Sequence, residues 1–152
     1  MTPQPNAAKN SIKFSDWPIV QLPGLSAQDC AQLSECGINT TVQLLVKANT
    51  SEKKLALANQ LQKPLHHVQK WVALADLARV PSVGCQFCGL LLHAGIASVN
   101  QLAQTSAHKV HQQILKLQVS TMQRRDLCPP VEEVSRWIQQ AKTLVSKSQK
   151  AS

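Results

Sequence analysis

Two segments of the sequence share one pattern of proline, glycine and apolar residues. The first runs from Leu22 to Ile38 (LPGLSAQDCAQLSECGI) and the second from Val80 to Ile96 (VPSVGCQFCGLLLHAGI). Each begins with an apolar residue and a proline, continues into an amphipathic stretch and ends in Gly-Ile. The offset of 58 residues is the same at the start and at the end of the segments. Self-similarity at a fixed offset predicts a fold built from two copies of one unit.

Apolar residues recur at helical spacing along most of the chain, and no segment has the alternation typical of a strand. Aromatic residues make up only 3% of the sequence, so the core must consist mainly of leucine, valine, isoleucine and alanine. We therefore expect an all-α fold packed as one compact domain. The predicted helices cover residues 27–36, a short stretch opened by 40–41, 51–62, 65–79, 85–94, a stretch from 105–106 to 117, and a last helix that begins at 129–130.

Helix ends can be predicted from single residues. Ser26 is placed to cap the first helix, and Gly37 is expected to end it as a left-handed C-terminal cap. Asn49 and Glu52 form a plausible capping pair for the helix at 51–62. The two helices that close the units carry Trp71 and Trp137 at matching places, where a role as core anchors is the simplest interpretation.

The two segments resemble the helix-hairpin-helix motif, whose pattern is apolar-Pro-Gly-apolar-Gly, a helix, Gly-Ile and a short helix. The match covers residues 22–45 and 80–103. Residues 17–145 as a whole also resemble an uncharacterised domain-of-unknown-function family that is common in cyanobacteria. The resemblance implies two tandem helix-hairpin-helix units, each followed by a helical pair. The implied division is a flexible arm (1–16), a first unit (17–79), a second unit (80–145) and a frayed tail (146–152).

Helix-hairpin-helix modules commonly bind DNA without sequence preference, so the resemblance implies phosphate-backbone binding through the hairpin loops. Loop glycines let the backbone approach a phosphate, and the amides at the next helix N-terminus supply donors. Serine replaces one glycine of each loop, and glutamine stands where family members often carry a lysine. The alternative is that the hairpins only pack helices together. The implied contact residues are Gly24, Leu25, Ser26, Ser82, Val83 and Gly84.

The chain is strongly basic, with a formal net charge of +8 and an isoelectric point near 9.5. Such a surface attracts nucleic acid, an anionic membrane surface or an acidic protein partner without choosing among them. Arg124 and Arg125 add a candidate basic patch in the second half, unless they simply lie on a solvated face. The leading hypothesis is a non-enzymatic module that binds nucleic acid; the alternative is a helical adaptor that binds another protein.

No enzymatic centre or cofactor is expected. The sequence has no phosphate-binding P-loop, no dinucleotide fingerprint and no paired carboxylates suited to acid–base chemistry. Cys85 and Cys88 form a CxxC at a helix start, where a thiol pKa can be lowered or a metal bound. However, Cys88 aligns with Cys30, where the motif requires a small buried residue, so core thiols are the favoured interpretation. The histidine pairs at 66–67 and at 108 and 111 favour solvated or capping roles over metal binding.

The first sixteen residues lack the apolar core of a signal peptide, and no apolar run approaches membrane-spanning length. We therefore expect a soluble, cytoplasmic protein without membrane insertion. In that compartment the five cysteines would be reduced thiols.

Overall fold

The structure, a computed structural model, describes residues 16–118 and 129–151. In these two ranges it contains one short 3-10 helix and eight α-helices, so the expected all-α fold is confirmed. The predicted N-terminal arm, apart from Asp16, and most of the predicted insertion at 118–128 lie outside the described residues.

The helices follow the same order in both halves of the chain. The first half contains η1 (Ile19–Gln21), α2 (Ala27–Glu35), α3 (Thr41–Lys47), α4 (Ser51–Leu61) and α5 (Leu65–Leu77). The second half contains α6 (Gly84–His93), α7 (Val99–Gln104), α8 (Ala107–Leu117) and α9 (Val131–Ala151). Helices α2 to α5 therefore correspond in order to α6 to α9, and the predicted ends of α2, α4, α5, α6 and α8 are right to within two residues.

Side-chain caps help the short helices α3 and α7 to form, with a complete capping box at α3. The Gln43 backbone amide donates a hydrogen bond to the Thr40 hydroxyl oxygen, and the Gln43 side-chain oxygen accepts from the Thr40 amide. Ser98 and Gln101 repeat the first of these bonds in α7, and the Gln101 side chain accepts from the Ala97 amide. Each cap satisfies an amide that a helix N-terminus leaves unpaired, which matters most for helices of seven and six residues.

Other predicted helix ends are partly confirmed. Ser26 caps α2, and Gly37 follows its end with a φ of +83°, as expected for a left-handed cap. The capping pair predicted at Asn49 and Glu52 is wrong: Thr50 is the cap of α4, and its side chain accepts from the Lys53 amide. The Thr50 hydroxyl oxygen accepts from the third amide of α4, so Thr50 is the N-cap residue and Asn49 precedes the cap. The backbone of α9 continues as a helix to Ala151, where the sequence indicated fraying from residue 146.

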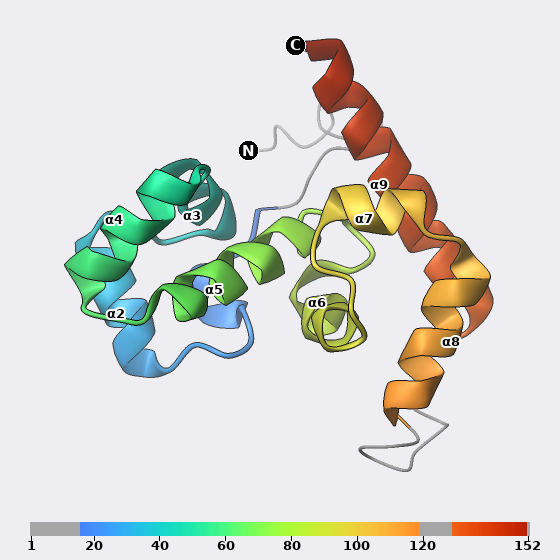
Figure 1. The fold of residues 1–152 in the computed structure, drawn as a ribbon, viewed down its shortest axis with the longest axis horizontal. Helices are drawn as coiled ribbons and strands as arrows, with labels where there is room; N and C mark the ends of the chain where they lie inside the picture. Colours follow the sequence, from blue (N-terminus) through green and yellow to red (C-terminus); the bar gives the residue numbers. More distant parts are fainter. Residues whose placement is uncertain (1–15, 119–128, 152) are drawn as a thin grey trace, which may run out of the picture.

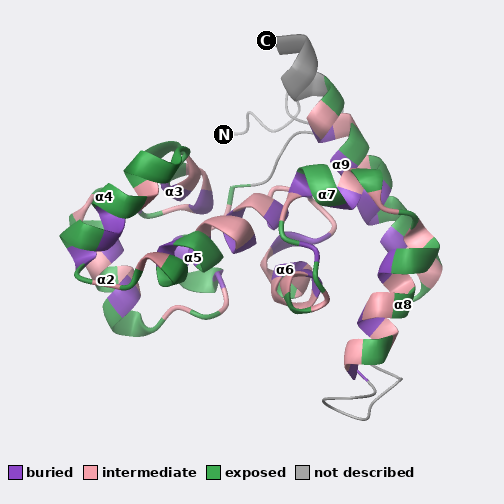
Figure 2. Cartoon of the chain, viewed as in Figure 1, coloured by how far each residue is buried: buried purple, intermediate pink, exposed green. Residues whose placement is uncertain are grey.

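Equivalent positions of the two halves are buried alike. Figure 2 shows the buried stretches on the helix sides that face neighbouring helices. The residues that follow the two Gly-Ile steps at a spacing of three are all buried, namely Ile38, Thr41, Leu44, Ile96, Val99 and Leu102. Trp71 and Trp137 are both buried, which confirms that they anchor the core. The repeat seen in the sequence is therefore a repeat of buried positions.

Helix α5 joins the two halves. It packs against α3 and α4 on one side and against α6 on the other, and in Figure 1 it lies between the group α2–α4 and the group α6–α9. Helix α9 runs along α7 and α8 and closes the second half. Asp76, near the end of α5, accepts a hydrogen bond of 2.8 Å from the Val99 amide at the start of α7. The two halves are thus held together by the packing of α5 and by the hydrogen bond between Val99 and Asp76.

Candidate binding surfaces

The first hairpin loop is exposed, but its helix N-terminus already holds a carboxylate. Gly24 and Ser26 are exposed and Leu25 is half-buried. Asp29, in the first turn of α2, is buried; its carboxylate accepts from the Ser26 amide at 3.0 Å. The Lys63 ammonium lies 3.0 Å from the same carboxylate. An incoming phosphate would therefore meet a negative charge in the place that it would itself take.

The carboxylate of Asp29 should make stability depend on acid. Burial raises its pKa, but the hydrogen bond from the Ser26 amide and the interaction with Lys63 outweigh burial, so its pKa is lowered from 3.8. A carboxyl group whose pKa is lower in the folded state stabilises the protein at pH values above its unfolded-state pKa. This stabilisation is lost as the pH falls through the folded-state pKa. We expect Asp29→Asn, which keeps a cap acceptor, to cost about 1 kcal/mol at pH 7.

The same variant should lose less stability than the wild type between pH 5 and pH 3. Urea unfolding followed by circular dichroism at both pH values measures the difference. Lys63→Met is the matched control, because it removes the counter-ion and leaves the carboxylate. Identical acid dependence in the wild type and Asp29→Asn would contradict the role assigned to this carboxylate.

The second hairpin loop is enclosed by other parts of the chain. The Ser82 amide donates to the Gln140 side-chain oxygen at 2.8 Å, and the Gln140 amide donates back to the Ser82 hydroxyl at 2.9 Å. Val83 is buried. Gly84 is buried beneath Trp17, where an added Cβ would lie 2.8 Å from the indole ring. Helix α9 and the segment before η1 therefore cover this loop.

The predicted contact residues that the structure describes differ in accessibility. Gly24, Leu25 and Ser26 lie on an open loop, whereas Ser82, Val83 and Gly84 are held by Gln140 and Trp17. Arg124 and Arg125 lie outside the described residues. The resemblance could not indicate the enclosure, because Trp17 and Gln140 are distant in sequence from the loop they cover.

The CxxC residues are protected thiols. Cys88 is fully buried, and burial, with Cys85 nearby, raises its pKa to about 12. Burial also raises the pKa of Cys85 to about 11. A thiolate is the reactive and metal-binding form, so neither residue suits redox chemistry. The core-thiol interpretation is confirmed for Cys88, while Cys30 and Cys36 are only half-buried.

Histidine, cysteine and acidic side chains do not gather into a possible metal site anywhere in the described ranges. His66 and His67 instead contact each other edge to face, with ring centroids 4.6 Å apart. Among the helices of the described chain, none is long and apolar enough to cross a membrane.

Most of the described lysines have no acidic partner. Within residues 16–118 and 129–146, ion pairs form between Lys63 and Asp29, Arg79 and Asp76, and Arg136 and Glu133. The lysines of this part of the chain that have no carboxylate within 4 Å are Lys47, Lys53, Lys54, Lys70, Lys109, Lys116 and Lys142. Their charge is available to an external anion.

The first half also exposes apolar side chains beside two hollows. In the described residues the large exposed hydrophobic side chains are Val20 (71% exposed), Val46 (62%) and Leu55 (49%). Val20 lines an apolar groove of about 600 Å³ between η1 and α2, together with Leu25, Ala27 and Cys30. Val46 lines a second cavity, of about 340 Å³, between α3 and α4. No periodicity in the sequence distinguishes these exposed residues from buried ones.

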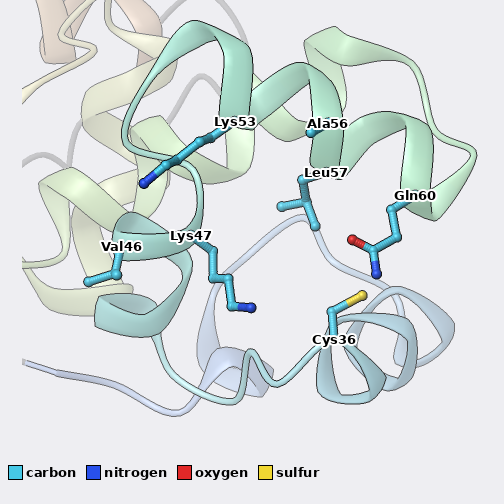
Figure 3. A pocket seen from close by; sticks show the side chains of 7 residues that line it. All are labelled: Cys36, Val46, Lys47, Lys53, Ala56, Leu57 and Gln60. Carbon is cyan, nitrogen blue, oxygen red and sulfur yellow. The ribbon is translucent and has the colours of Figure 1, made fainter.

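The cavity between α3 and α4 combines cationic and apolar groups (Figure 3). Its floor is the buried Leu57, and Lys47 and Lys53 contribute two ammonium groups. Figure 3 shows the Lys47 side chain directed toward the Cys36 thiol and the Gln60 amide. The cavity can therefore hold a carboxylate beside an apolar side chain.

The sequence was compared with known families and proteins. A family model described as Domain of unknown function (DUF4332) matches residues 23–144. The chain belongs to the DUF4332 family. No match was found among curated proteins or among solved structures. The DUF4332 match spans both repeats, from the first hairpin loop to α9, and so confirms the resemblance to an uncharacterised domain family.

Proposed function

We propose that this DUF4332-family protein is a non-enzymatic binding module that acts as a helical adaptor for another protein. One observation carries the proposal: in the described residues, the exposed large apolar side chains all lie between residues 20 and 55, and two of them, Val20 and Val46, line concave surfaces. Exposed apolar groups beside a hollow, with polar and charged groups around them, are typical of protein interaction sites. The free lysines nearby favour a partner with an acidic surface.

The adaptor proposal is tested by affinity purification from the cells that make the protein, with nuclease added to remove nucleic acid bridges. We expect the wild type to retain the same partner before and after nuclease. The triple variant Val20→Ser, Val46→Ser, Leu55→Ser should lose it. Exposed serines cost little stability, which thermal unfolding would verify. Loss of every retained protein on nuclease treatment would overturn the proposal.

A second candidate is binding to the phosphate backbone of nucleic acid, as the hairpin resemblance implies. The observation that favours it is the set of lysines without acidic partners on a chain of net charge +8. Binding of this kind weakens steeply with salt, because phosphate contacts release counterions. Fluorescence anisotropy with labelled duplex DNA across a salt series tests it. Absence of binding at low salt would exclude this candidate.

A further inference from the structure

The cavity between α3 and α4 has a charge that nothing in the described structure neutralises. Lys47 is in the last turn of α3 and Lys53 in the first turn of α4, and both side chains line the cavity. Neither ammonium group has a carboxylate within 4 Å in the part of the chain that is described. Two like charges at one opening create a local preference for an anionic group.

The neutral groups of the cavity indicate what kind of anion fits. Leu57, on the floor, is buried, Ala56 lies beside it, and Val46 stands 62% exposed on the rim. The Gln60 amide and the Lys47 ammonium both face the space above this floor (Figure 3). An occupant would therefore gain charge-assisted hydrogen bonds and also bury an apolar group.

A nucleic-acid strand matches this lining poorly. Single strands are usually bound by aromatic side chains that stack on bases, and no aromatic residue lines the cavity. A sugar-phosphate backbone gains little from an aliphatic floor. Protein segments, by contrast, carry carboxylates and aliphatic side chains next to each other.

We propose that this cavity binds a short segment of a partner protein in which an aspartate or glutamate lies next to an aliphatic side chain. The carboxylate pairs with the Lys47 ammonium, Lys53 adds to the positive potential of the cavity, and the aliphatic side chain packs on Leu57. This inference rests on the proposed adaptor function and specifies the chemistry of its partner. The thiol of Cys36, on the cavity wall, then provides a reporter of occupancy.

A phage-displayed library of random 12-residue peptides, selected on the immobilised full chain, tests the inference. We expect the selected peptides to be enriched in aspartate or glutamate adjacent to leucine, isoleucine or valine. Labelled copies of these peptides are then measured by fluorescence anisotropy. The double variant Lys47→Glu, Lys53→Glu should weaken binding at least about tenfold, because it replaces two attractions by repulsions.

The matched control is Lys109→Glu, Lys142→Glu, which makes the same charge change at exposed lysines of α8 and α9. It should change affinity less than about twofold, which separates local contact from overall charge. A second readout needs no variant: saturating peptide should slow alkylation of Cys36 by iodoacetamide and leave alkylation of Cys85 unchanged. Peptide-level mass spectrometry measures both rates.

The results that would contradict this binding site differ from those that would contradict the adaptor function. Selected peptides that bind the Lys47→Glu, Lys53→Glu variant as tightly as the wild type would overturn the site. A library that yields no acidic-aliphatic peptide would also overturn it, as would protection of Cys36 by duplex DNA but not by peptide. The adaptor function is judged separately, by the nuclease-treated purification, and survives any of these results if its partner is retained.

Discussion

Replacement of Trp137 with alanine is expected to lower the free energy of unfolding by about 4 kcal/mol. The side chain is fully buried in α9, its ring centroid lies 5.1 Å from that of Phe87 on α6, and its indole donates to Glu133. Alanine would leave a large cavity between helices that cannot close without losing other contacts. Urea unfolding followed by circular dichroism measures the change without relying on tryptophan fluorescence.

Two controls accompany Trp137→Ala. Trp137→Phe keeps an aromatic ring against Phe87 and should lose about half as much stability. Val46→Ala removes an exposed apolar side chain and should change stability by less than about 0.5 kcal/mol. A loss for Trp137→Ala similar to that of Val46→Ala would mean that Trp137 is not packed in the core against Phe87 as described.

Replacement of Gly84 with alanine should be almost as damaging, at about 3 kcal/mol. Gly84 has a φ of +52°, a region that costs a residue with a Cβ about 1–2 kcal/mol. The new Cβ would also lie 2.8 Å from the Trp17 ring, and Trp17 is fixed by a hydrogen bond of 2.8 Å from its indole to the Ala78 carbonyl. Displacement of that ring adds about 1–3 kcal/mol. Chemical denaturation of the purified variant measures the total.

Gly89→Ala is the matched control. Gly89 lies in the same helix without a positive φ, and an added Cβ would come no closer than 3.5 Å to Pro23. Alanine there should be neutral or stabilising by up to about 1 kcal/mol, because glycine weakens a helix interior. In a Trp17→Ala background, the loss of unfolding free energy caused by Gly84→Ala should fall to the about 1–2 kcal/mol that the positive φ alone costs. An unchanged cost would exclude the Trp17 contact as its cause.

The helical order and the repeat could be predicted because they depend on local features. Helix propensity, proline breaks, Gly-Ile steps and apolar spacing act within a few residues, and so the helices, the Gly37 cap and the buried Trp71 and Trp137 are where the pattern indicated. The choice of Thr50 over Asn49 as a cap was missed, because either side chain can perform that role. Only the backbone conformation decides between them.

Surfaces were predicted less well than helices because they depend on contacts between distant residues. The hairpin loops looked equivalent in sequence, yet Gln140 and Trp17 cover one of them and leave the other open. Likewise, Val46 follows two leucines in an apolar run, yet it is 62% exposed whereas Leu44 is fully buried. The cavity with Lys47 and Lys53 is lined by residues of two helices and by Cys36, and no local pattern encodes their meeting.

The hydrogen bond from the Trp17 indole to the Ala78 carbonyl limits how this repeat can be rearranged. Trp17 precedes the first repeat but covers the hairpin that opens the second, whose other cover is Gln140 on the last helix. A second repeat expressed from residue 80 onward would therefore keep Gln140 but lose the Trp17 cover of this loop, and would lack α5 beside α6. Such a chain could not be lengthened by simple insertion of further copies. The two copies are therefore not interchangeable, because each makes contacts that the other does not.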